Sequence, residues 1–354
     1  MATQTINGIT LFSPNDPCLV FNPCLFRLTG TISRTRVSIT SGGRHYETTY
    51  QTPSGGYLDL RQYLQTFFDG SNFGQDFELM GDLQASDLGK QVTITLEALD
   101  SDGTVIATFN KSIYCVWGGV AVGERYNEAT RHLTWFRNYP FTVGLYASAA
   151  KTVEYSSYIV SPQDGGLVRH VVLPSAGLYN VNINDDGDVT QRFITLIDAA
   201  SPYKEHAIIK IDREHDEGIY LRWVNRHGMW DYHLFKAGDD TRNAASRFGM
   251  WYRNNLAKFY QEDGWQGDAG RRQSFTCNDV LPLCAPLVDD ETFERLQDIT
   301  TSPVIDMFLG YDQHDEPTWT AATVEAGSYT KDAKKPEQDF IFNLLLPEIP
   351  VQTL

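Results

Sequence analysis

Two polar segments of the chain have spacings that metal ligands can adopt. In the first, Asn182, Asn184 and Asp186 occupy alternate positions, as in a calcium-binding EF-hand loop. Phe193 stands where the closing bidentate glutamate should be, so a polar turn between two strands is the favoured interpretation. Residues 212–217 hold four carboxylates and one histidine, which suit either a divalent ion or a solvated, charged loop, the latter being favoured. We therefore expect no metal and no other cofactor.

Motifs typical of enzyme active sites are missing from the sequence. It contains no Gly-x-Ser-x-Gly elbow, no Cys–His signature, no glycine-rich phosphate loop and no His-Glu-x-x-His motif. A carboxylate pair for glycoside hydrolysis can always be drawn from 45 acidic residues, so their number is no evidence for one. The five cysteines lack zinc spacing and are expected to be reduced, buried thiols. We predict that the protein is not an enzyme.

Aromatic side chains interleaved with polar ones are a third feature that could carry function. Mixtures of this kind stack on sugar rings or anchor protein interfaces. The favoured alternative is that they fill the core under the sheet of their own module. The candidate interface or glycan-binding residues are Trp230, Tyr232, Trp251, Tyr252, Tyr260 and Trp265.

Charge and composition limit the partners of this 354-residue chain. Its net charge of −16 argues against wrapping nucleic acid, which requires clustered Lys and Arg, and disfavours an anionic membrane surface. No apolar run is long enough to span a bilayer, and the first residues do not resemble a signal peptide. We expect synthesis and assembly in the cytoplasm, and a neutral partner such as a glycan or a basic protein surface.

Alternating apolar and polar residues predict a mainly β protein, built as a multi-module β-sandwich with a few short helices. We expect three modules, at residues 1–116, 117–202 and 203–354. Helical spacing predicts helices near residues 58–69 and 291–299, the second capped by Asp289 or Asp290.

The densest pattern is a predicted hairpin at residues 217–235, here called the signature hairpin. Two alternating, aromatic-rich strands flank a turn at Asn225 to Gly228, and Trp223 is expected to be buried in a core. The segment resembles a motif of tail-associated virion structural proteins from phages and prophages that infect Bacteroides-type gut bacteria. Residues 57–69, Trp117-Gly-Gly with residues 131–141, and residues 296–354 resemble other parts of those proteins, so the resemblance covers most of the chain.

This resemblance implies a structural protein of the virion, in the tail or tail tip, made in the host cytoplasm. It would assemble symmetrically with copies of itself and with other tail proteins. The alternative is a tail module that binds a host-surface glycan or receptor. After an apolar strand at residues 340–346, the last residues either continue their own module or form an assembly arm that pairs with a neighbouring subunit. The candidate arm residues are Glu348, Ile349, Val351 and Leu354.

Overall fold

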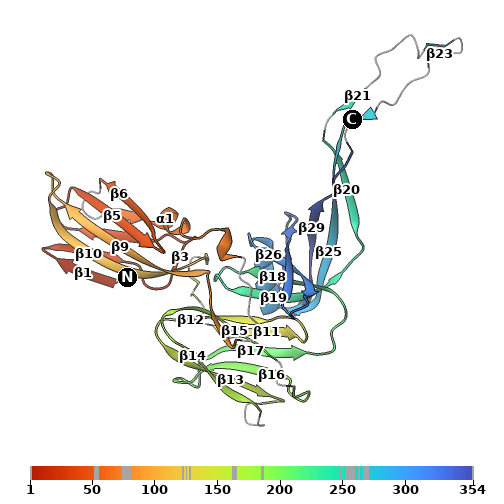
Figure 1. The fold of residues 1–354 in the computed structure, drawn as a ribbon, viewed down its shortest axis with the longest axis horizontal. Helices are drawn as coiled ribbons and strands as arrows, with labels where there is room; N and C mark the ends of the chain where they lie inside the picture. The colour runs from red at the N-terminus through yellow and green to blue at the C-terminus, as the bar shows by residue number, and fades with distance from the viewer. Residues whose placement is uncertain are drawn as a thin grey trace.

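The protein is mainly β, as predicted, with 55% of the described residues in strands and 6% in helices. In the computed structural model, two β-sandwich modules and a third β module form the chain, and a long hairpin projects from the third (Figure 1). The structure describes residues 2–51, 56–73, 81–121, 123–124, 126, 129–161, 166–184, 187–247, 249–251, 260–261, 264–265 and 271–352.

The first module is a sandwich of two sheets. One has the strand order β1 (Ala2–Ile6), β2 (Ile9–Ser13), β4 (Leu25–Thr29), β7 (Tyr57–Asp59). The other has the order β3 (Cys18–Leu19), β10 (Val105–Val116), β9 (Gly89–Leu99), β5 (Arg34–Ser41), β6 (Arg44–Tyr50). Alternate residues of both sheets point inward and form one apolar core, in agreement with the period-2 pattern. All five cysteines of the chain are free, and all except the half-buried Cys284 are buried.

The helix predicted at residues 58–69 is shorter than expected. Leu58 lies in β7 and pairs with Phe26, so it contributes to the core from a strand. The α-helix α1 spans only Arg61–Gln65, and a 3-10 turn, η1, follows at Gly70–Asn72. Sheet pairing at Leu58 replaces the first helical turn, since strand and helix spacing both bury that leucine.

The second module is also a sandwich. Its five-stranded sheet has the order β11 (Arg131–Phe136), β17 (Glu205–Asp212), β16 (Phe193–Asp198), β13 (Lys151–Tyr158), β14 (Val168–Leu173). Its three-stranded sheet has the order β12 (Thr142–Ala147), β15 (Gly177–Asn182), β8 (Leu83–Ala85). This module therefore takes one strand, β8, from the first predicted module and one, β17, from beyond the predicted boundary at residue 202.

The third module is built on one eight-stranded sheet. Its order is β27 (Pro317–Ala321), β26 (Ile305–Tyr311), β18 (Ile219–Val224), β19 (Trp230–Ala237), β25 (Phe275–Asp289), β29 (Glu337–Glu348), β28 (Thr323–Val324), and β20 (Thr241–Ser246) pairs with β25. Helix α3 (Asp290–Gln297) and the 3-10 turn η3 (Asp298–Thr300) cover one face. The predicted cap is confirmed, because the Asp289 side chain accepts a hydrogen bond from the Thr292 backbone N–H at 2.8 Å.

The segment at residues 241–280 is here called the β-arm, and its described strands form the projecting hairpin. β20 and β25 run antiparallel from Thr241↔Val280 to Ser246↔Phe275. Beyond them, β21 (Met250–Trp251) pairs with β24 (Arg271–Arg272), and β22 (Tyr260–Gln261) pairs with β23 (Gly264–Trp265). Figure 1 shows the β-arm leaving the body in a direction away from the first module. Within the described residues, no helix is long and apolar enough to cross a membrane.

Candidate functional site

The turn of the signature hairpin is ordered by a single asparagine. The Asn225 side-chain oxygen accepts hydrogen bonds from the backbone N–H groups of His227 at 2.9 Å and Met229 at 3.1 Å. Its amide nitrogen donates to Asp231 at 3.1 Å. Gly228 has a φ of +68°, a conformation that side chains other than glycine rarely adopt. The Asn-Arg-x-Gly part of the motif is therefore explained by turn chemistry.

This turn packs directly on the Trp117-Gly-Gly segment between the first and second modules. The Gly119 N–H donates to the Arg226 carbonyl at 2.8 Å. A Cβ on Gly118 would lie 2.6 Å from that same carbonyl oxygen, and a Cβ on Gly228 would lie 2.7 Å from the Trp117 carbonyl oxygen. Two motifs that are more than a hundred residues apart in sequence thus meet, and each needs glycine because the backbones touch.

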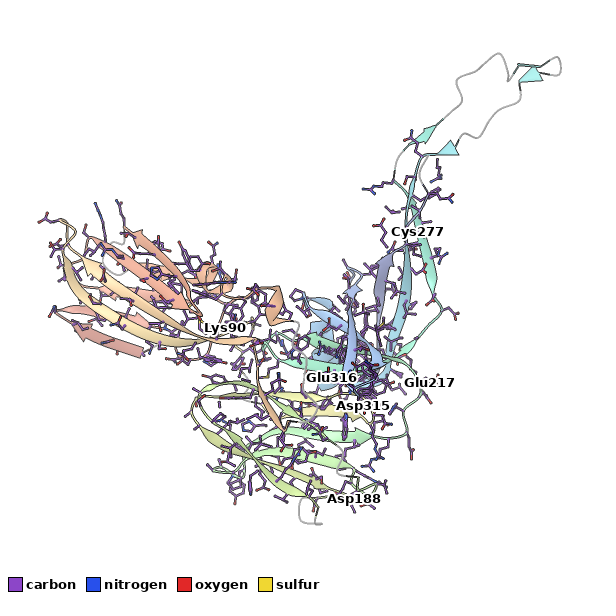
Figure 2. All side chains as sticks on the ribbon, viewed as in Figure 1. Lys90, Asp188, Glu217, Cys277, Asp315 and Glu316 are labelled. Carbon is purple, nitrogen blue, oxygen red and sulfur yellow. The ribbon has the colours of Figure 1, made fainter. Side chains whose placement is uncertain are left out.

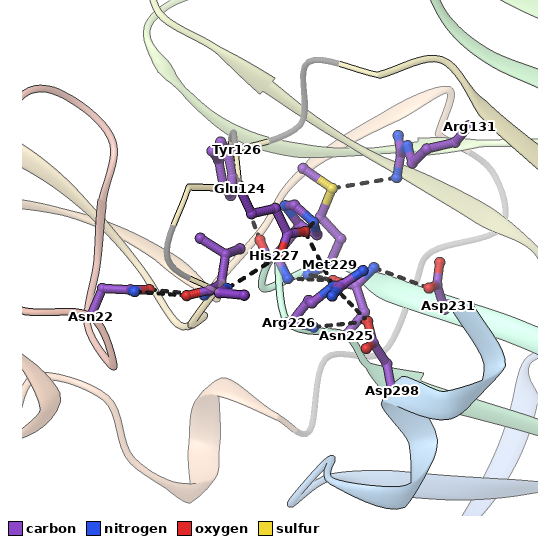
Figure 3. A network of polar contacts seen from close by, with 12 residues as sticks. Asn22, Glu124, Tyr126, Arg131, Asn225, Arg226, His227, Met229, Asp231 and Asp298 are labelled. Atoms are coloured by element: carbon purple, nitrogen blue, oxygen red, sulfur yellow. Dashed lines mark hydrogen bonds and ion pairs between the residues drawn. The ribbon is translucent and has the colours of Figure 1, made fainter. Parts of the chain in front are cut away.

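A polar network surrounds this contact (Figure 3). Glu124 lies 3.2 Å from the His227 ring nitrogen and 3.3 Å from the Arg226 guanidinium. Arg226 also lies 3.6 Å from the Asp298 carboxylate at the end of α3. On the other side, the Asn22 side chain exchanges two hydrogen bonds with the Val120 backbone, at 2.8 and 2.9 Å. The network therefore connects the first module with the third through Val120 and Glu124, which follow the Trp117-Gly-Gly segment.

A pocket of about 470 Å³ opens at this junction. Phe21 and the half-buried Trp117 form an aromatic wall, with ring centroids 4.6 Å apart. Arg226, Asp298 and Ser302 line the pocket as polar groups. An aromatic wall facing hydrogen-bonding side chains suits a small polar ligand with an apolar face, such as a sugar ring.

Burial tunes the charges beside the pocket. It raises the pKa of Asp298 to about 6, although the Arg226 guanidinium acts in the opposite direction. Burial also lowers the pKa of His227, against the pull of Glu124. Near neutral pH the junction thus combines a neutral histidine with a carboxylate that gains a proton in mild acid.

The strands of the signature hairpin are buried on both faces, which explains their aromatic content. Trp223 is fully buried, as predicted, in the core cluster that also contains Phe293 and Leu296 of helix α3. The opposite face carries Arg222, which is 4% exposed, donates to Asp306 at 2.8 Å, and lies between the rings of Trp230 and Trp319 at 4.5 and 4.2 Å. Sequence reasoning did not single out Arg222, Phe21 or Asp298, because their partners come from distant segments.

The aromatic candidates divide into two groups. Trp230 and Tyr232 are 1% and 2% exposed, so they belong to the core and are closed to a ligand. Trp251, Tyr260 and Trp265 have backbones in the short β-arm strands, while Tyr252 lies outside the described residues.

The C-terminal candidates follow the base of the β-arm. Glu348 ends β29 and pairs with Asn278, and the Ile349 N–H donates to the Cys277 carbonyl at 2.7 Å. Val351 is half-buried and Leu354 lies outside the described residues. Residues 348–349 thus extend a strand of their own module.

The two segments that were weighed as metal sites make hydrogen bonds within the protein. Asn182 ends β15 and donates to the Gly81 carbonyl, and Asn184 accepts through its backbone from Tyr155 at 3.1 Å. Asp186 lies outside the described residues. In the loop at residues 212–217, the Asp212 side chain accepts from the Glu214 N–H at 3.0 Å. Among the residues that the structure describes, no group of three or more His, Cys, Asp or Glu side chains is placed to hold a metal ion.

Comparisons with known proteins do not assign the chain to a family. No family model and no curated protein matches the chain. One similar solved structure comes from work described as "Structural insight into host cell surface retention of a 1.5-MDa bacterial ice-binding adhesin". The two share 11% identity over 85% of this chain and 89% of that chain, with a TM-score of 0.15, a value too low to carry any argument.

Proposed function

We propose that this chain is a structural protein of a phage particle, acting in the tail by assembly with copies of itself and with neighbouring tail proteins. The sequence resemblance of the signature hairpin suggests the virion, and the β-arm is the observation that supports assembly. Every residue of β20 is exposed, and its outer edge has no strand beside it among the described residues. An exposed strand edge of this kind, with unpaired backbone N–H and C=O groups, is a template for pairing with a strand of another chain.

Shortening the β-arm tests this proposal. Ser246 and Phe275 are Cα partners, so an Asn-Gly dipeptide in place of residues 247–274 closes the hairpin with a two-residue turn. We expect the full chain to form a defined oligomer by native mass spectrometry, and the shortened chain to keep its far-ultraviolet spectrum but dissociate.

Two results bear on the virion itself. Location of the chain in the tail of a reconstructed phage particle would support the proposal. A full chain that stays monomeric at micromolar concentration, and that does not co-sediment with phage tails, would contradict it.

The pocket at the module junction favours a second candidate, a tail module that binds host-surface glycan. Phe21 is 44% exposed and forms the aromatic wall beside Arg226 and Asp298. Titration calorimetry with host polysaccharide fragments tests this function, with Phe21→Ala as the variant. Tyr203→Ala is the control, because Tyr203 is 98% exposed and lies outside the pocket. Binding that Phe21→Ala leaves unchanged would exclude the pocket.

A further inference from the structure

An acidic groove lies where the second module meets the third. It has a volume of about 490 Å³ and is lined by six Asp or Glu residues and two Lys residues. Lys236 pairs with Asp216 at 3.1 Å, whereas Glu214 and Glu217 are exposed at the rim. Figure 2 shows Glu217 at the edge of the body, on the side away from the first module. The groove therefore presents excess negative charge to solvent.

A buried histidine in this groove has an unused ring nitrogen. His233 lines the groove and is 7% exposed, and its ring packs edge-on against Phe136 and Phe235, with centroids 5.2 and 4.9 Å away. Its Nδ1 atom has no hydrogen-bond partner within the described part of the chain. Burial lowers the pKa of His233 to about 3, so the ring is neutral and one of its nitrogens can accept a hydrogen bond. A buried nitrogen without a partner favours a ligand that donates a hydrogen bond to it.

The β-arm has the opposite charge to the rest of the chain. Residues 241–280 contain six Lys or Arg and four Asp or Glu, a net charge of +2 in a chain of net charge −16. Of these, Arg242 pairs with Asp279 within the β-arm at 2.8 Å, while Arg247 and Arg272 have exposed side chains. A basic projection on an acidic body is complementary to the body of another copy.

We infer that the acidic groove receives the β-arm of a second copy of this chain, with arginine guanidinium groups of the β-arm meeting the rim carboxylates and His233. This inference rests on the proposed function and names the partner surface within it. Leu287, which is 69% exposed on a bulge of β25 beside the acidic residues, adds an apolar contact to the same groove. Guanidinium suits the site because its N–H fork can donate to carboxylates and to a neutral imidazole together.

Charge reversal in the full-length chain tests the inference. One variant carries Glu214→Lys and Glu217→Lys, a second carries Arg247→Glu and Arg272→Glu, and a third carries all four changes. We expect each double variant to raise the dissociation constant for self-association, measured by sedimentation equilibrium, at least about tenfold, since it places like charges together. The quadruple variant restores opposite charges and is expected to recover most of the loss.

The matched control is Asp102→Lys with Glu316→Lys, two exposed acidic positions outside the groove that change the net charge by the same amount as the groove variant. Far-ultraviolet spectra and melting temperatures establish that each variant is folded. Oligomers that neither double variant weakens, or that the control weakens equally, would overturn the groove inference and leave the assembly function standing. A wild-type chain that is monomeric and does not join phage tails would overturn both. A calcium or magnesium ion that binds the groove with no effect on self-association would also overturn the inference.

Discussion

Removing the carboxylate that pairs with Arg222 is expected to be among the most destabilising single changes in the third module. Arg222 is 4% exposed and Asp306 is 15% exposed, and the two side chains meet at 2.8 Å between sheet strands β18 and β26. Asp306→Ala leaves a guanidinium without its anion in a site closed to water. Breaking a buried ion pair on one side costs about 3–5 kcal/mol.

The same geometry predicts that the effects of the two partners are not additive. The rings of Trp230 and Trp319 lie over the guanidinium at 4.5 and 4.2 Å, so Arg222→Met keeps an elongated side chain in that slot while removing the charge. The double variant Arg222→Met with Asp306→Ala leaves neither charge unpaired. We expect it to be more stable than the sum of the two single changes by about 1–3 kcal/mol.

Urea unfolding followed by tryptophan fluorescence measures these free energies, since the indoles of Trp230 and Trp319 report on the site itself. Asp279→Ala is the control, because Asp279 pairs with Arg242, whose side chain is 65% exposed, and such a pair contributes little. A cost below about 1 kcal/mol for Asp306→Ala, or strict additivity in the double variant, would refute the reasoning.

Three further predictions test the hairpin and the module junction. Trp223→Ala empties a fully buried site and is expected to lower the free energy of unfolding by about 3–5 kcal/mol in urea titration; a variant as stable as the parent would contradict this. Gly118→Ala is expected to lower the melting temperature, since its Cβ would lie 2.6 Å from the Arg226 carbonyl oxygen, whereas Gly70→Ala meets no atom within 4 Å and should not. The raised pKa of Asp298, about 6, makes its ionisation unfavourable in the folded state, so its contribution to stability is full below about pH 4 and is lost as the pH rises through 6. Asp298→Asn is expected to remove about 2–3 kcal/mol of this pH dependence, and urea midpoints that track the parent at every pH would exclude the effect.

Local patterns were sufficient to predict much of the fold. Alternation along residues 219–224 and 230–235 predicted two strands, and the Asn225 and Gly228 turn between them is formed by contacts within five residues. Helix α3 was predicted from its cap and its inward Phe293, for the same reason. The strand period and the helix period both place the Leu58 side chain in the core, so the pairing of Leu58 with Phe26 decides which of the two structures forms. The local sequence does not reveal this pairing, and the prediction at Leu58 was a helix.

The sequence by itself determined the class of fold and the hairpin, because strand alternation, turn residues and helix caps act over a few neighbours. The sequence left two roles open for Trp230 and Tyr232, a core role and a binding role, and only the tertiary structure decided between them, because apolar residues of the second module cover both side chains. It also decided the site, because Phe21, Arg226 and Asp298 line one pocket only after three distant segments have docked. Contacts between distant segments depend on how whole sheets pack, and no local spacing in the chain encodes them.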